Sequence, residues 1–279
     1  MLLTDSTTII TQDNIQLLHI ENAFANAKIS LFGGHILSFK PKHDHRERLW
    51  VSQHAFFDGK KAIRGGIPIC WPWFGAHHSN TNLAAHGYVR TQTWQIISCE
   101  ETETGTTITL QPQSSAGDGF EGDAQLVLVV HVGQQLTIQL CTTNLGDTPL
   151  TYNCALHSYF AIADIKQCEL LGLSKQYSDK TRGYQMLDTP KPYQFSEETD
   201  RVHQEQPKVL TITDGKNKTD IRSTGHDSIV VWNPWQEKSI SMGDMADDGY
   251  LTMLCVETAI THGQEVAPKA THILEQVIK

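Results

Sequence analysis

The sequence has no apolar run long enough to cross a bilayer, and its first residues carry no sign of export. The N-terminal stretch MLLTDSTTII lacks the basic region and the long apolar core of a signal peptide. Paired cysteines are also missing, because the six cysteines are scattered and none belongs to a CxxC motif. Such spacing in a chain of 279 residues is typical of reduced thiols. We therefore expect a cytoplasmic protein with no membrane partner.

Basic residues are too few to balance the acidic ones. The chain holds 22 Lys and Arg against 31 Asp and Glu, and its formal net charge is −9. Nucleic acids and anionic membrane surfaces require basic patches, so this balance argues against both as partners. An anionic small molecule would have to be bound by a few cations gathered at one place.

Several signatures of catalytic chemistry are absent. The sequence contains no GxSxG nucleophile elbow, no GxxxxGK[ST] phosphate loop and no HExxH zinc motif. The charged stretch at residues 43–47 includes His43-x-His45, but no third metal ligand accompanies this pair. We expect that stretch to form a solvated turn. We also expect no metal site and no cofactor.

What the sequence has in abundance is alternation of apolar and polar residues with a period of two. Segments such as NIQLLHIEN, QLVLVVHV and QLTIQLCTTN are typical of short strands, and turn residues separate them. No helical periodicity lasts beyond two turns, and there is neither a repeat nor a low-complexity linker. The pattern predicts an all-β fold, a large antiparallel β-sandwich that forms one domain over residues 1–279. We expect this domain to be a monomer.

The stretch RGGIPICWPWFG at residues 64–75 stands apart from this pattern, because it concentrates glycines, prolines and aromatic side chains. Trp71, Trp73 and Phe74 offer flat apolar faces that suit a sugar ring. Arg64 opens the stretch with a planar guanidinium that fits carboxylate or phosphate. The alternative is a buried aromatic loop that closes one end of the core.

Two ionisable residues lie in strongly apolar segments, His157 in ALHSYF and Glu257 in LTMLCVETAI. A carboxylate in such a place costs free energy unless a partner compensates it. The pair could be a buried ion pair with a structural role. It could also be an acid–base pair, because burial raises the pKa of a carboxyl and imidazole titrates near neutrality.

Six motifs then occur in one order along the chain: RGGIPICWPWFG, HGYVR, ALHSYF, ETDRV, WNPW and CVETA. In this order they resemble the hexose-6-phosphate mutarotase branch of the aldose 1-epimerase family. The resemblance covers nearly the whole chain, and it implies a galactose mutarotase-like β-sandwich. It also implies an isomerase that interconverts the α and β anomers of a hexose 6-phosphate, most simply glucose 6-phosphate.

The resemblance assigns roles to the two buried ionisable residues. It implies that Glu257 is the base that takes the proton of the anomeric hydroxyl, and that His157 is the acid that protonates the ring oxygen. His86 of HGYVR takes the place of a second sugar-facing histidine. Proton transfer alone opens and closes the ring, so the chemistry requires no metal or cofactor.

The resemblance also implies a set of substrate-binding residues. Arg64 and Arg90 match arginines that bind the substrate, Asp200 matches an acidic residue that contacts sugar hydroxyls, and Trp73 is expected to face the ring. Ala85 departs from some relatives, which have Gln directly before the HG of this motif. Two alternatives stay open, a mutarotase for another hexose and a non-catalytic sugar-binding or regulatory protein on the same fold.

Overall fold

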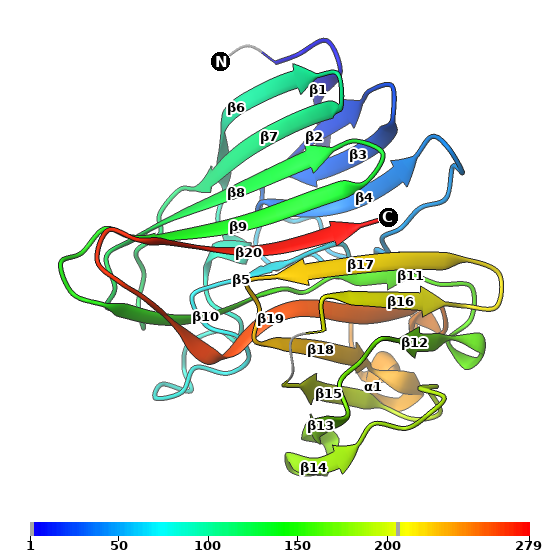
Figure 1. Ribbon diagram of the computed structural model, residues 1–279. Helices are drawn as coiled ribbons and strands as arrows, with labels where there is room; N and C mark the ends of the chain where they lie inside the picture. The colour runs from blue at the N-terminus through cyan, green and yellow to red at the C-terminus, as the bar shows by residue number, and fades with distance from the viewer. Residues whose placement is uncertain (1–2, 205–206) are drawn as a thin grey trace.

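The alternating segments of the sequence form antiparallel strands, which make up most of the regular structure (Figure 1). The computed structural model describes residues 3–204 and 207–279, so the first two residues of the N-terminal stretch lie outside it. The described strands form two eight-stranded sheets and one four-stranded sheet. The prediction of an all-β fold built as a large antiparallel sandwich is confirmed.

The four-stranded N-terminal sheet has the order β1-β2-β3-β4. Its strands are β1 (Thr7–Gln12), β2 (Ile15–Glu21), β3 (Ala25–Ser30) and β4 (His35–Pro41). A second sheet, called here the β20 sheet, has the order β12-β16-β17-β20-β9-β8-β7-β6. Its strands are β6 (Trp94–Thr102), β7 (Gly105–Pro112), β8 (Ala124–Val132), β9 (Leu136–Asn144), β12 (Glu169–Leu171), β16 (Val209–Thr213), β17 (Lys218–Thr224) and β20 (Thr271–Ile278).

The third sheet, called here the β19 sheet, has the order β14-β13-β15-β18-β19-β10-β5, and β11 also pairs with β19. Its strands are β5 (Ile69–Cys70), β10 (Leu150–Leu156), β11 (Tyr159–Ala161), β13 (Gln176–Asp179), β14 (Gln185–Asp188), β15 (Thr199–His203), β18 (Ser228–Asn233) and β19 (Met253–Val266).

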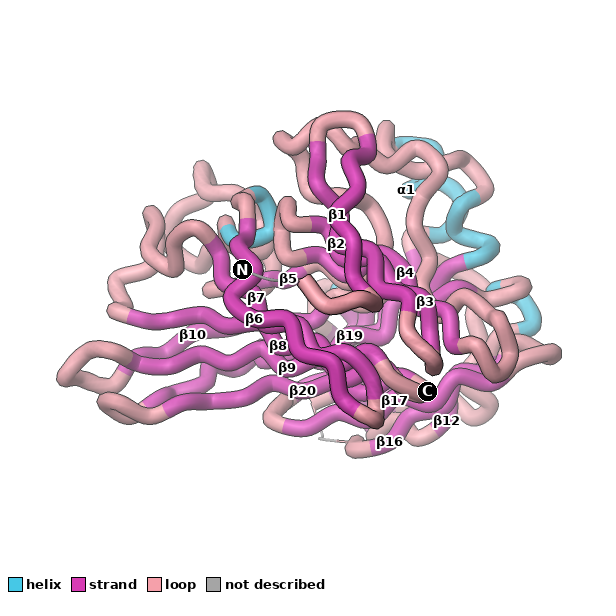
Figure 2. Tube along the Cα trace, turned by 90° about the horizontal axis from the view of Figure 1, so that it is seen from above, coloured by secondary structure: helices cyan, strands magenta, loops and turns pink. Residues whose placement is uncertain are grey.

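Helical turns are few and lie at the periphery of the strands (Figure 2). They are α1 (Trp235–Ser241) and the 3-10 turns η1 (Val89–Thr91), η2 (Ile165–Gln167), η3 (Lys180–Arg182) and η4 (Gly249–Thr252). Within residues 3–204 and 207–279, none of these helices has the length and apolar character that a membrane span requires.

Strand β19 is buried on both of its faces over its first half, and the two faces do different things. Leu254 and Val256 point into the main core, which they share with residues of the other two sheets such as Ile138. Cys255 and Glu257 alternate with them and therefore point to the opposite face. Because protein covers both sides, this segment reads in the sequence as an almost continuous apolar run.

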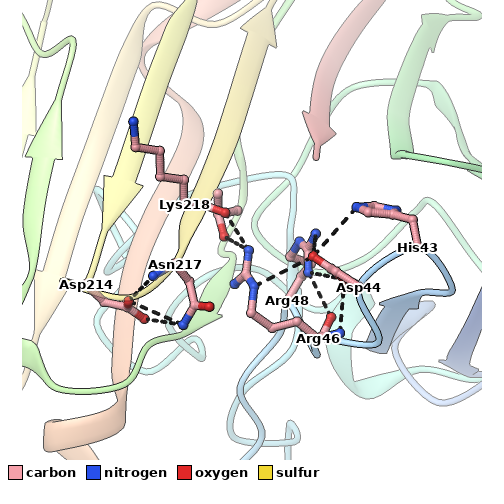
Figure 3. A network of polar contacts seen from close by, with 8 residues as sticks. His43, Asp44, Arg46, Arg48, Asp214, Asn217 and Lys218 are labelled. Atoms are coloured by element: carbon pink, nitrogen blue, oxygen red, sulfur yellow. Dashed lines mark hydrogen bonds and ion pairs between the residues drawn. The ribbon is translucent and has the colours of Figure 1, made fainter.

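The charged stretch at residues 43–47 is not simply a solvated turn (Figure 3). Arg48 directly after it is only 2% exposed, and its Nη2 lies 2.7 Å from an Asp44 carboxylate oxygen. Arg46 donates from Nη2 to the backbone oxygen of Lys218, at the start of β17. His43, Asp44 and His45 are exposed, as expected for a solvated turn, and Arg46 in addition connects this turn to the distant β16–β17 hairpin.

Candidate active site

His157 and Glu257 meet because they lie opposite each other on neighbouring strands. From Cys154 to Ala161, strands β10 and β11 pair with β19 in one antiparallel register, and residues 157 and 158 lie between the two strands. That register puts His157 directly across from Glu257. The imidazole Nε2 is 3.5 Å from Oε1 of the carboxyl group. Both side chains project from the face of the β19 sheet that points away from the main core.

Burial dominates the protonation of this pair. The side chain of Glu257 is 1% exposed, and burial raises the pKa of this carboxyl well above its ordinary value, with a further increase from the negative charge of Asp200. The side chain of His157 is 12% exposed, and burial lowers the pKa of its imidazole well below 6.5, assisted by His86 and Arg90. When His157 and Glu257 hold one acidic proton between them, the free protein therefore favours this proton on the carboxyl group of Glu257, with the imidazole neutral.

A cavity of about 300 Å³ opens in front of the pair. It is lined by Arg64, Phe74, His86, Arg90, His157, Tyr159, Lys180, Asp200, Val230, Trp232, Lys238, Met242 and Glu257. All the candidate site residues of the sequence analysis therefore line one cavity, with the exceptions of Trp73 and of Trp71, which is 0% exposed within the main core. Strands β15, β18 and β19 supply its floor, and the aromatic stretch at residues 64–75 supplies part of its wall.

Trp73 is turned away from this cavity, which corrects the expectation that it faces the sugar ring. Its indole N–H donates to the backbone oxygen of Ala84 at 3.0 Å. Its ring meets His77 and Tyr88 edge to face, with centroid distances of 4.7 and 5.6 Å. The next residue, Phe74, points the other way and provides the aromatic wall.

His86 is held with one ring nitrogen free for a ligand. Its Nδ1 accepts a hydrogen bond from the backbone N–H of Gly75 at 3.3 Å, so Nε2 carries the ring proton. Burial, together with the charge of Arg90, lowers the pKa of His86 to about 3 and keeps the ring neutral. Gly87 is required beside it, because its φ is +73° and a Cβ there would lie 1.9 Å from the backbone oxygen of Trp71.

The two arginines of the cavity have different surroundings. Nε and Nη2 of Arg64 each lie 3.1 Å from the same carboxylate oxygen of Asp244. Nη1 of Arg64 donates to the hydroxyl of Tyr159 at 3.0 Å. Arg90 donates from Nη2 to the backbone oxygen of Ala85 at 2.9 Å. Among the described residues no carboxylate forms an ion pair with Arg90. Its remaining N–H donors are therefore available to a ligand.

Two lysines of the cavity were missed by the sequence analysis. Lys180 begins the turn η3, and its Nζ is 3.0 Å from a carboxylate oxygen of Asp200. Lys238 lies on α1, and its Nζ is 2.6 Å from a carboxylate oxygen of Glu198. Neither lysine belongs to a recognisable motif, because short irregular segments far apart in the sequence carry them. With the two arginines they give the lining four cationic side chains against the two carboxyl groups of Asp200 and Glu257.

The thiol of Cys255 lies next to the His157–Glu257 pair. Ligand atoms of His157, Cys255 and Glu257 lie within 4.8 Å of one another, and no other such group occurs in the described part of the chain. Burial raises the pKa of Cys255 well above 9.0, so its sulfur keeps the proton. A metal ion binds the thiolate and the ionised carboxylate, and burial opposes both forms here.

A β-sandwich with a neutral imidazole and a buried carboxyl group in one polar pocket is suited to proton transfer on a small polar ligand. The family model described as aldose 1-epimerase matches residues 16–279. The chain therefore belongs to the aldose 1-epimerase family, as the order of its motifs predicts.

Curated relatives agree with this assignment over nearly the whole chain. A protein of Escherichia coli (strain K12), named "Putative glucose-6-phosphate 1-epimerase", is 33% identical over 271 residues, which are 95% of this chain and 90% of the relative. A protein of Salmonella typhimurium with the same name is 35% identical over 272 residues, again 95% and 90% of the two chains. A crystal structure described as a "putative mutarotase" from Salmonella typhimurium has a TM-score of 0.92 at 32% identity, and the match covers 99% of this chain and 94% of that one. The prediction of a galactose mutarotase-like sandwich is confirmed.

Proposed function

We propose that the protein interconverts the α and β anomers of a hexose 6-phosphate, with glucose 6-phosphate as the first substrate to test. The observation that carries the proposal is an acid–base pair and an arginine with free donors in the same small cavity. An acidic chain would repel a sugar phosphate unless local cations reversed the field at the site. Arg90, a lining cation without a carboxylate partner among the described residues, supports an anionic ligand.

The proposed reaction uses the two groups of the pair in opposite senses. The carboxylate of Glu257 accepts the proton of the anomeric hydroxyl, and C1 and its oxygen become a carbonyl. The C1–O5 bond breaks, and its electron pair goes to O5, which takes the proton from Nε2 of His157. Rotation about C1–C2 and closure by the reverse steps give the other anomer. Acid–base groups placed in this way typically contribute about 10²–10⁴-fold each.

The protonation of the free protein fits one stage of this cycle. After ring opening, Glu257 holds a proton and His157 is neutral, and burial favours this distribution of protons. Ring closure returns the proton to His157. The two groups carry the same number of protons at both stages, so a turnover needs no proton exchange with solvent. The distance of 3.5 Å between Nε2 and Oε1 supports direct coupling of the two groups.

The rest of the cavity supplies orientation. His86 can donate from Nε2 to a sugar oxygen, and the carboxylate of Asp200 can accept from hydroxyl groups. Phe74 and Trp232 offer apolar faces to the carbon side of the ring.

Within the proposed function the cations have separate roles. Arg90, Lys180 and Lys238 are the candidates for the phosphate group, because the first has free donors and the two lysines form ion pairs that a dianion can displace. Arg64 is already paired, and it holds Tyr159 parallel to the imidazole of His157, with a centroid distance of 5.0 Å and an interplanar angle of 12°. We therefore assign Arg64 to the support of the acid–base pair.

The test is anomer exchange measured by NMR on glucose 6-phosphate and on glucose. We expect a kcat/KM for glucose 6-phosphate that exceeds the value for glucose by at least about tenfold, which corresponds to one charge-assisted contact. Equal rates on the two sugars would instead indicate a mutarotase without phosphate selectivity. Binding without exchange would indicate a sugar-binding protein.

A further inference from the structure

Strand β20 carries a polar residue where its pattern calls for an apolar one. Leu274, Gln276 and Ile278 point in turn into the core between the β19 and β20 sheets, and all three are 0% exposed. Leu274 and Ile278 belong to the main hydrophobic cluster. An uncharged amide in this position is costly unless its donors and acceptor are satisfied.

The amide of Gln276 forms hydrogen bonds with residues of β19 and with Ser158, which lies between β10 and β11. Its Oε1 accepts from the hydroxyl of Ser158 at 2.5 Å. Its Nε2 donates to the hydroxyl of Thr258 at 2.8 Å and to the backbone oxygen of Val256 at 3.3 Å. Gln276 therefore spans the core and connects two adjacent segments on the far side.

These two segments are the ones that carry the acid–base pair. Ser158 directly follows His157, and Thr258 directly follows Glu257. Successive residues of a strand point to opposite faces, so the pair faces the cavity while Ser158 and Thr258 face the core. One side chain thus holds, from behind, the two backbone positions that set the separation of imidazole and carboxyl.

We propose that Gln276 is a positioning residue of the proton-transfer step, which rests on the proposed function of His157 and Glu257. A methionine would fill a similar volume in this core without burying an amide. The hydrogen bonds of Gln276 provide direction that apolar packing lacks, because they fix two backbone segments relative to one another. Proton transfer is sensitive to that geometry, since a displacement of about 1 Å can reduce a rate by about 10²-fold.

The test is the Gln276→Met variant, assayed for anomer exchange on glucose 6-phosphate. We expect kcat to fall by about tenfold or more and KM to change less than about twofold, because the substrate contacts remain. We also expect the pH limits of kcat to move by about half a unit or more, since the coupling of the pair changes. A loss of folded protein would instead lower the rate by the same factor at every pH.

The matched control is Ser223→Ala. Ser223 lies directly across from Gln276 on β17, and its hydroxyl also bonds that of Thr258, at 2.7 Å, but among the described residues it forms no hydrogen bond with Gln276 itself. We expect kcat and its pH limits to stay at wild-type values in this control. If Gln276→Met lowers the midpoint of thermal unfolding, Thr258→Val is assayed in its place. This variant removes one hydrogen bond of Gln276 with little change in volume, so it tests positioning with less loss of stability.

Three results separate the possibilities. The positioning role is supported if a stable Gln276→Met variant has a reduced kcat and shifted pH limits. If Gln276→Met is unstable, the same result in Thr258→Val supports it. Wild-type kcat and pH limits in the stable variant overturn it. Glu257→Gln is measured in parallel, because full activity in that variant would overturn the proposed function itself.

Discussion

The replacement of Arg90 by Met tests the assignment of the phosphate group most directly. Arg90 spends one N–H on the backbone oxygen of Ala85 and has no carboxylate partner within the described residues. Methionine keeps much of the apolar stem but removes the charge and all the donors. Turnover of glucose 6-phosphate should therefore fall, while turnover of unphosphorylated glucose should change little.

The size of the loss follows from the contacts that Arg90 can make. A hydrogen bond to a charged group contributes about 1.5–3 kcal/mol, and each 1.4 kcal/mol corresponds to about a factor of ten. The full range would be about 10- to 150-fold in kcat/KM. Because Arg90 is half-buried and water screens part of its field, we expect the lower part of this range, about 10- to 30-fold. Arg90→Lys should restore only part of it, because the planar fork is lost.

The assay compares kcat/KM for both sugars by NMR exchange, with Arg64→Met as the contrasting variant. Arg64→Met removes bonds to Asp244 and Tyr159, so it should reduce turnover of the two sugars by similar factors. It should also lower the free energy of unfolding by about 1–3 kcal/mol, because two polar partners lose their hydrogen bonds. Equal losses on both sugars in Arg90→Met would refute the phosphate assignment.

Three further predictions concern the acid–base pair. Glu257→Gln should reduce kcat by about 10²-fold or more, since an amide cannot accept the proton. The stability of this variant relative to wild type should rise with pH above about 4.5, because the pKa of Glu257 is raised in the folded state and ionisation therefore favours the unfolded wild type. Exchange rates and urea unfolding at pH 5 and pH 8 check the two parts. The kcat of the wild type should have a bell-shaped dependence on pH. It should fall on the acid side, below pH 6.5, where His157 and Glu257 are both protonated, and on the alkaline side, where the pair loses its one remaining acidic proton. A flat profile in wild type, or a wild-type rate in His157→Asn, would contradict a histidine acid. Treatment with EDTA should leave the rate unchanged, because Cys255 keeps its proton and the steps need no Lewis acid; a loss that one added metal ion restores would contradict this expectation.

The fold was readable from the sequence because alternation of period two follows from the geometry of a strand. Of the segments with clear alternation, QLVLVVHV and QLTIQLCTTN became strands β8 and β9 of the β20 sheet, where every second side chain faces the core, and NIQLLHIEN became β2 of the N-terminal sheet. Strand β19 was readable only as an apolar segment with a carboxyl group inside it. Alternation is hidden there, because both faces of the strand are covered.

The site was predictable where a residue type is chemically unusual for its surroundings. Glu257 and His157 stood out because ionisable groups are rare in apolar strands. The direction of Trp73 was not predictable, because which of two adjacent aromatic residues faces a cavity depends on the path of an irregular loop. Lys180 and Lys238 were missed for a related reason, since exposed lysines are common and only the folded chain brings these two to one place.

The two-sided burial of β19 determines how such a protein can change over generations. A single-residue insertion or deletion within this strand would exchange its two faces, so that Glu257 would enter the core and Thr258 the cavity. Such a change would reduce stability and impair proton transfer together, so natural selection acts on both properties through the same few residues of β19. Lys180 and Lys238 come from η3 and α1 at the rim, where substitutions leave the strand register untouched. Under the proposed function, preference for one sugar phosphate over another can therefore diverge at the rim while the reaction itself is inherited unchanged.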